Sequence, residues 1–280
     1  MRSAIDFGIT NTDAVTYANG KIYRWNLPSD GHLTMELVKT VLAAGEVELT
    51  ALKDLAVTGG QHRNLPDKIG KCGITKVNEV TAIGRGGQAL AGLTKETFET
   101  PILVVSAGSG TAVVAARGHT YTHITGTGVG GGTLLGLGRL LLNTADPKEI
   151  DALALQGDPN GADLSLADVV SGPIGNLPPD VTAVNFGRLA RPGIQASRED
   201  LAAALVTLVG QVIAVTGINA ARAQALERVV VTGHLIDMPS VREVLQRVSD
   251  IYHLNLILPK DAGYATALGA LLHVAPDVES

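Results

Sequence analysis

Short apolar runs alternate along the chain with stretches whose apolar positions recur at a helical spacing. The apolar runs predict β-strands at 3–7, 14–17, 21–25, 54–58, 101–106, 111–117, 228–232 and 255–258. The helical spacing predicts helices at 33–44, 78–93, 137–142, 149–155, 165–170, 198–226, 240–252 and 264–273. Strands followed by helices, with a hairpin near the start of each half, indicate an α/β chain built from two related halves.

Glycines stand at the ends of several predicted strands. Gly8, Gly59, Gly108 and Gly233 each follow an apolar run closely. A glycine lets backbone N–H groups approach a ligand, and the ligands of α/β proteins bind at the carboxyl ends of strands. The placement therefore predicts a ligand site where these strand ends meet.

Composition and charge exclude several classes of protein. Hydrophobic residues make up 45% of the chain and charged residues 18%, which is typical of a folded globular protein. The net charge of -5 argues against a nucleic-acid surface, and the single cysteine, Cys72, excludes a disulfide framework. No targeting segment is visible, and the most apolar stretch, 201–214, is shorter than the roughly 20 residues of a bilayer span. We therefore expect a cytoplasmic protein with no nucleic-acid or membrane partner.

Two polar hairpins carry groups suited to a metal-bound phosphate. In the first, residues 6–13 (DFGITNTD), Asp6 offers Mg²⁺ a carboxylate, while hydroxyls and backbone amides offer donors to phosphate oxygens. The second, residues 106–111 (SAGSGT), repeats this design with smaller residues. Facing each other, the two would clamp a polyphosphate; taken alone, the first also fits an ordinary polar hairpin.

Three further features are candidates for ligand chemistry. The glycine-rich loop at 125–133 (TGTGVGGGT) leads into an apolar helix, whose free N–H groups and dipole favour an anion. It is not a Walker motif, because no Gly-Lys-Ser/Thr follows. Gly233 fits either contact with a nucleotide's base or ribose, or a plain strand-to-helix turn. Glu79 fits either a charge at a helix start or a general base near a phosphoryl acceptor.

These motifs resemble the actin/Hsp70/sugar-kinase fold, which shares the Asp-x-Gly-x-Thr after the first strand and a late motif like GYATALGA at 263–270. More narrowly, GTGVGGGTLLGLG at 126–138 resembles the signature of type II pantothenate kinases. The similarity continues through QGD at 156–158, PPDVTAVNFG at 178–187 and NAAR at 219–222, so it covers nearly the whole chain. It implies a duplicated, two-domain ribonuclease H-like α/β fold with mixed sheets and a nucleotide cleft between domains at 1–117 and 118–280.

The resemblance also implies a reaction: transfer of the ATP γ-phosphate to the primary hydroxyl of pantothenate, the first step of coenzyme A biosynthesis. It implies Mg²⁺, a homodimer built on the long helix at 198–226, and regulation by coenzyme A or its thioesters. Glu79 would be the catalytic base, and Asp6 would be catalytic and hold the metal. The implied nucleotide-binding residues are Gly8, Thr10, Asn11, Thr12, Gly108, Ser109, Gly110, Thr111, Gly128, Gly130, Gly131, Gly132 and Gly233. The implied acceptor-binding residues are Ser106, His123, Thr125 and Thr127.

Two positions depart from the family pattern. Family members usually carry a lysine where this chain has Asp13, and an arginine that contacts pantothenate where it has His123. Two other classes therefore stay open. One is a relative with weakened catalysis that binds a nucleotide or coenzyme A. The other is an ATPase or hydantoinase-type enzyme of the same fold, whose N-terminal motif resembles residues 10–15 (TNTDAV).

Overall fold

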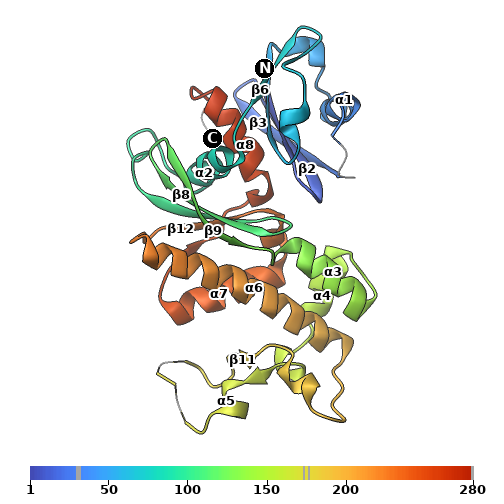
Figure 1. Ribbon diagram of the computed structural model, residues 1–280, viewed down its shortest axis with the longest axis vertical. Coiled ribbons are helices and arrows are strands. Elements are labelled where there is room, and N and C mark those ends of the chain that lie inside the picture. The colour runs from blue at the N-terminus through green and yellow to red at the C-terminus, as the bar shows by residue number, and fades with distance from the viewer. Residues whose placement is uncertain (30–32, 173, 176, 279–280) are drawn as a thin grey trace.

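The computed structural model describes residues 1–29, 33–172, 174–175 and 177–278, which form two mixed β-sheets with helices between and around them (Figure 1). The first sheet has the strand order β3-β2-β1-β4-β6-β5. Its strands are β1 (Arg2–Phe7), β2 (Asn11–Ala18), β3 (Lys21–Pro28), β4 (Asp54–Gly59), β5 (Lys68–Ile69) and β6 (Cys72–Lys76). β1, β2 and β3 form an antiparallel meander, and β4 continues from β1 in parallel.

The second sheet repeats this topology, in the order β13-β12-β7-β8-β9. Its strands are β7 (Ile102–Ala107), β8 (Thr111–Arg117), β9 (Thr120–Thr127), β12 (Val229–Thr232) and β13 (Leu256–Ile257). Again three strands form an antiparallel meander, and β12 pairs with the first of them in parallel. The predicted α/β fold with two related halves is therefore confirmed. A small sheet joins β10 (Leu164–Ser165) to β11 (Thr182–Val184).

Helices α2 (Glu79–Leu90) and α8 (Ala265–Val274) lie between the sheets, and helices α6 (Arg198–Ala223) and α7 (Pro239–Tyr252) lie beyond the second sheet (Figure 1). The remaining helices are α1 (Met35–Ala44), α3 (Gly131–Leu142), α4 (Pro147–Ala154) and α5 (Leu166–Val169). α1 covers the outer face of the first sheet, where the indole N–H of Trp25 donates to the carbonyl of Val41 at 2.7 Å.

The predicted domain boundary between residues 117 and 118 differs from the sheet pairing. It separates β8 from β9, which are antiparallel neighbours over most of their length. The chain passes from the first sheet to the second between α2 and β7, and α8 then returns to pack on β1 and β4. The sequence pattern missed this because both hairpins look alike and a returning helix leaves no signal in the residues around it.

The glycine-rich segment is also more ordered than predicted. Its first part, through Thr127, belongs to β9, and α3 begins at Gly131 rather than near residue 137. Only 128–130 connect the two elements. Glycine lowers helix and strand propensity, so propensity alone predicts a loop, and close packing overrides it here.

On length and composition alone, α6 could cross a membrane, and it is the one such helix in the described part of the chain. Its most apolar stretch has a mean hydropathy of 2.2, and 67% of that stretch is buried inside the fold. This apolar stretch of α6 is longer than the run at 201–214, which the sequence pattern indicated to be too short for a bilayer span. Its buried residues, among them Leu205, Val209 and Ile213, belong to the core between the second sheet and α7.

Candidate active site

Four polar residues lie side by side across the first sheet, near the carboxyl end of β1. Asp6 pairs with Asp13 on β2 and with Thr58 on β4, and Asp13 pairs with Asn26 on β3. Residues in register on neighbouring strands point to the same face of a sheet. Ala4, two positions before Asp6 on β1, packs with residues of α2 and α8. This polar row therefore lies on the sheet face that turns toward those helices.

The second sheet has a matching row in the equivalent strands. Ser106 on β7 pairs with Thr232 on β12 and with Ala112 on β8, which in turn pairs with Gly126 on β9. Val104, two positions before Ser106, packs against α2. The two rows thus stand at corresponding places in the repeated halves, and the acidic groups belong to the first half alone.

A glycine follows the threonine of each row and makes room for the neighbouring strand. Gly59 and Gly233 have φ of +85° and +103°, where a side chain is strained. A Cβ on Gly59 would overlap the Asp6 carboxylate and the backbone of Phe7. A Cβ on Gly233 would overlap the backbone of Ala107. These glycines therefore let the strand ends converge on the site.

The tips of the two polar hairpins face each other. The hydroxyl oxygens of Thr10 and Ser109 are 2.7 Å apart, across 99 residues of sequence. The first turn is tight, because a Cβ on Gly8 would lie 2.6 Å from the carbonyl oxygen of Asn11. Both hydroxyls are at the molecular surface and form a hydrogen bond with each other, so the two hairpins meet at an accessible point of the fold.

The start of α3 is docked on the second hairpin. The N–H groups of Gly131 and Gly132 donate to the carbonyls of Gly108 and Ser109 at 2.8 and 2.9 Å. A Cβ on Gly130 would lie 2.8 Å from atoms of this hairpin. Two of the amides predicted to bind phosphate are therefore already used in packing. The glycine run therefore packs against the second hairpin and fixes its position.

Asp6 lies in a strongly acidic environment. Burial, followed by the charges of Asp13 and Glu79, raises the pKa of Asp6 from 3.8 to about 8, with His234 acting in the opposite direction. Glu79 is the exposed first residue of α2, which Asn78 caps by accepting a hydrogen bond from the Val80 N–H at 2.9 Å. Glu79 is therefore near enough to Asp6 for its charge to act on that carboxyl group.

His234 reaches this acidic group from the other half of the fold. It follows Gly233 at the end of β12, and its Nε2 lies 2.7 Å from Oδ1 of Asp13 on β2. Its Nδ1 lies 3.0 Å from Oδ2 of Asp237. Burial would lower the pKa of His234, but the hydrogen bonds to the two carboxylates, and their charges, raise it to about 10. The ring is therefore cationic at neutral pH.

The family model described as Fumble matches residues 36–273. The chain belongs to the Fumble family. Type II pantothenate kinases from Bacillus cereus (strain G9842) and Oceanobacillus iheyensis are each 28% identical to it, over 224 and 217 residues. These matches cover 79% and 77% of this chain and 82% and 80% of those proteins. The predicted resemblance is therefore confirmed.

Solved structures with the same fold cover almost the whole chain. The activator of 2-hydroxyisocaproyl-CoA dehydratase from Clostridium difficile, with bound ADPNP, superposes with a TM-score of 0.65 at 16% identity, over 99% of this chain and 95% of that one. A ROK family glucokinase from Streptomyces griseus, in complex with glucose and AMPPNP, gives 0.58 at 14%, over 96% and 97%. At these identities the likeness shows the fold, and the predicted actin/Hsp70/sugar-kinase fold is confirmed.

Within this Fumble-family fold, two predicted nucleotide-binding threonines lie on the sheet faces opposite the two polar rows. Thr12 is fully buried, because strand alternation places it on the sheet face opposite Asp13, and its hydroxyl has no hydrogen-bond partner among the described residues. The Thr111 hydroxyl donates to the carbonyl of Val129 at 2.8 Å. Both side chains are therefore enclosed in the fold, and nucleotide binding by these two threonines stays a prediction for their backbone amides.

The predicted acceptor residues of β9 are divided between its two faces. An irregularity between Val113 and Val114 makes His123 pair with Val114 and Thr125 with Val113. Because consecutive residues of β8 point to opposite faces, His123 and Thr125 do too. The Thr127 hydroxyl accepts a hydrogen bond from the Val129 N–H at 3.2 Å. Of these three, His123 is exposed and on the face toward α2.

Several residues around the acidic group carry no signal of their own in the sequence pattern. They are Asn26, Thr58, His234 and Asp237, whereas Asp13 is notable only as a departure from the family pattern and Tyr264 only as part of the motif at 263–270. The Asn26 amide donates to the Tyr264 hydroxyl at 3.4 Å, and the Tyr264 ring stands edge-on to His234 with centroids 5.3 Å apart. One signal was available: Thr58-Gly59 and Thr232-Gly233 are the same dipeptide at the ends of equivalent strands.

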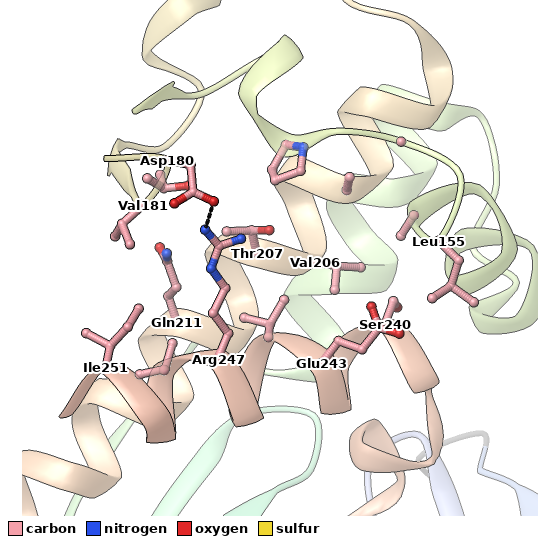
Figure 2. Close-up of a pocket in the computed structure, with 17 residues that line it drawn as sticks. Leu155, Asp180, Val181, Val206, Thr207, Gln211, Ser240, Glu243, Arg247 and Ile251 are labelled. Carbon is pink, nitrogen blue, oxygen red and sulfur yellow. Dashed lines mark hydrogen bonds and ion pairs between the residues drawn. The ribbon is translucent and has the colours of Figure 1, made fainter. Parts of the chain in front are cut away.

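A separate cavity of about 230 Å³ lies at the other side of the second half, between α6, α7 and residues 154–182 (Figure 2). Arg247 and Asp180 form an ion pair across it at 2.6 Å. Figure 2 shows Gln211 and Thr207 pointing toward the same hollow from α6. None of the predicted site residues lines it, so the site proposed below rests on the converging strand ends.

Proposed function

We propose that the chain phosphorylates the primary hydroxyl of pantothenate to give 4'-phosphopantothenate, the first step of coenzyme A biosynthesis, with ATP and Mg²⁺. The observation that carries this proposal is the meeting of two polar hairpins, with Thr10 and Ser109 hydroxyls 2.7 Å apart, beside a carboxylate row that includes Asp6. Phosphoryl transfer suits this arrangement, because positioning and charge stabilisation supply most of the catalysis.

Family membership makes the chain an ATP-dependent kinase, and the proposal concerns its acceptor. The relatives at 28% identity are named type II pantothenate kinases, which supports pantothenate. The fold neighbours hold ADPNP and AMPPNP, which supports ATP as the donor. In this chain Thr10, Ser109 and Gly128 would contact the phosphates, and Gly233 would lie near the adenine.

The residues present fit a magnesium ion. Asp6 is raised in pKa to about 8 by burial and by neighbouring carboxylates, so a divalent cation would favour its ionised form. No group of three or more His, Cys, Asp or Glu side chains within the described ranges could hold a metal alone. That agrees with Mg²⁺, which takes one or two carboxylates together with substrate phosphates and water. When bound, Mg²⁺ would neutralise charge on the phosphates.

Glu79 would accept the proton of the attacking hydroxyl. It is exposed at the first turn of α2, and its charge acts on Asp6, which supports a position at the edge of the proposed phosphate site. A general base must reach the hydroxyl proton, and a position near the metal ligand allows this. His123, exposed on the face of β9 toward α2, and Ser106 in the second row would contact the acceptor.

Three further features belong to the same proposal. A homodimer would form along α6, where Leu208, Val212 and Val215 are only half-buried and follow a helical spacing on one side. The protein would work in the cytoplasm, where ATP and pantothenate are found. Coenzyme A or its thioesters would act as regulators by competing for the nucleotide or acceptor site.

The decisive experiment measures ADP release from Mg-ATP by the purified protein, with and without pantothenate. We expect release to depend on pantothenate and to yield a phosphorylated product detectable by mass spectrometry. ATP binding without stimulation by pantothenate would contradict the proposal. It would favour a binding protein with weakened catalysis, or an ATPase or hydantoinase-type enzyme if ADP release occurred without any acceptor.

A further inference from the structure

His234 is held between two carboxylates that come from different parts of the fold. Asp13 belongs to β2 of the first sheet, and Asp237 belongs to the turn after β12, with contacts of 2.7 and 3.0 Å to the two ring nitrogens. The side chain of Asp13 is 8% exposed and that of His234 is 26% exposed. A Cβ on Gly263 would overlap the ring, and Tyr264 stands edge-on to it. The imidazole is therefore fixed in place with both nitrogens engaged.

This arrangement matters because of where Asp13 lies. It is the cross-strand neighbour of Asp6, and its charge contributes to raising the pKa of that residue. Glu79 adds another negative charge to the same region. A nucleotide polyphosphate entering between the hairpins would approach all of these carboxylates. Charges of the same sign that lie close together repel strongly where water is excluded.

We propose that His234 compensates the charge of Asp13, so that a nucleotide polyphosphate can bind beside Asp6. The buried carboxylate of Asp13 is thereby turned from a repulsive group into one side of a bridge between the halves. The raised pKa of His234, about 10, agrees with this role. The inference rests on the proposed function for the presence of a nucleotide and is independent of the acceptor.

The test compares nucleotide affinity in the full-length protein by titration calorimetry with ADP, with and without Mg²⁺. His234→Gln leaves Asp13 charged and without its cation, and we expect the Kd for ADP to rise about tenfold or more. Asp13→Asn removes the repulsive charge itself and should bind ADP at least as tightly as wild type. The double variant Asp13→Asn/His234→Gln should return to within about threefold of wild type.

Arg24→Gln is the matched control. Arg24 on β3 also contacts the C-terminal segment, at 3.9 Å from Asp261, but it lies outside the polar row. We expect its ADP affinity to equal that of wild type. The thermal midpoint of each variant shows whether it is folded. Should His234→Gln fail to fold, Asp13→Asn still tests the inference, because weaker ADP binding by that variant would overturn it.

Two other outcomes would also overturn it: unchanged affinity in His234→Gln, or a double variant that binds no better than His234→Gln alone. A wild-type protein that binds no ADP would overturn it as well. These results are separable from those of the turnover assay. If nucleotide binding follows the expected pattern but pantothenate does not stimulate ADP release, the acceptor is wrong and the role of His234 stands.

Discussion

Folding favours the protonated form of Asp6, whereas the proposed metal binding needs its ionised form. Its pKa in the folded protein is raised from 3.8 to about 8, first by burial and then by Asp13 and Glu79. The folded state therefore binds a proton that the unfolded chain has released, and the free energy of unfolding falls as pH rises from about 4 to about 8. Asp6→Asn removes this loss. Without Mg²⁺, we expect its thermal midpoint to exceed that of wild type by a margin that grows across this range.

The same variant should have no Mg²⁺-dependent turnover. Thermal scans at several pH values, with and without Mg²⁺ and ADP, check both parts of the prediction, and each kcal/mol shifts the midpoint by roughly 2–4 °C in a protein of this size. Addition of Mg-ADP should stabilise wild type and leave Asp6→Asn unchanged. A margin that does not vary with pH, or normal metal dependence in the variant, would show that Asp6 has a different role.

Glu79→Gln should separate catalysis from binding. Because a general base contributes about 10²–10⁴-fold to the rate, kcat should fall by that factor while the Kd for ADP changes little. Steady-state kinetics and calorimetry measure the two quantities. Glu243→Gln, an exposed change on α7 at the distant cavity, is the control and should behave as wild type. Unchanged kcat in Glu79→Gln would remove this residue from the role of base.

Individual residues also show where sequence reasoning stopped. Asp6 and Glu79 could be selected because a carboxylate at a strand end, or at a helix start beside glycine hairpins, has a recognisable chemistry. The bond from Asp13 to His234 joins residues 221 positions apart. Nothing near either residue in the chain indicates the other. Thr12 shows the reverse case, because a hydroxyl in a promising motif is turned away by the alternation of β2.

At the scale of elements, the glycines between β9 and α3 have two different roles, because one is needed for packing and another is free of packing contacts. A Cβ on Gly130 would lie 2.8 Å from three atoms of the second hairpin, whereas a Cβ on Gly128 would meet no atom within 4 Å. Gly130→Ala should therefore destabilise the protein by about 1–3 kcal/mol through overpacking. Gly128→Ala should leave stability nearly unchanged and raise the KM for ATP, since a methyl group there would stand in the proposed phosphate site.

Denaturant titration and steady-state kinetics of the two variants check this contrast. Each glycine serves as the control for the other, because both changes add one methyl group to the same short segment. Equal stability in both variants would mean that α3 is not docked on the hairpin as described. An unchanged KM for ATP in Gly128→Ala would exclude this position from phosphate binding.

Most strands and helices were predictable because their periodicity is set by burial on one face. The strands at 14–17, 21–25 and 111–117 follow directly from their apolar runs, and the Asn-Gly pair between the first two is typical of a tight hairpin turn. The strands β5, β6, β10 and β11 were missed, since short segments carry too few positions to show a period. The eight-residue strand β9 was missed as well, because its residues are mostly polar and no position of it is fully buried. The early start of α3 was missed because its glycines are selected by contact with another hairpin.

For the whole molecule, the repeated topology explains why two related halves could be predicted from the sequence and why the boundary between them could not. Two meanders followed by parallel strands yield glycines at equivalent places, so a related pair of halves could be inferred from the chain. The boundary between the two halves could not be inferred, because α8 comes from the end of the sequence and packs on the first sheet. The C-terminal helix thereby closes the fold, and each half depends on the other.

The crossing of α2 and α8 tests this dependence directly. A Cβ on Gly269 would overlap the carbonyl oxygen of Ala82 and the backbone of Gly86, because the two helices meet with almost no side chain between them. Gly269→Ala should therefore lower the free energy of unfolding by about 1–3 kcal/mol or more, by forcing the halves apart. Gly136→Ala is the matched control, since Gly136 is an exposed helical glycine of α3 with no atom near its Cβ position.

The control should gain about 0.5–1 kcal/mol from higher helix propensity, so the two changes differ in sign although both replace a helical glycine by alanine. Urea titration followed by circular dichroism measures both. We also expect Gly269→Ala to weaken ADP binding. The contact between α2 and α8 sets the position of the polar row of the first sheet relative to the second hairpin, so a shift of these helices would move the two apart. If Gly269→Ala is as stable as wild type and binds ADP equally well, the helix contact does not set the relation between the halves, and the site must be held together by its hairpins and the bridge at His234.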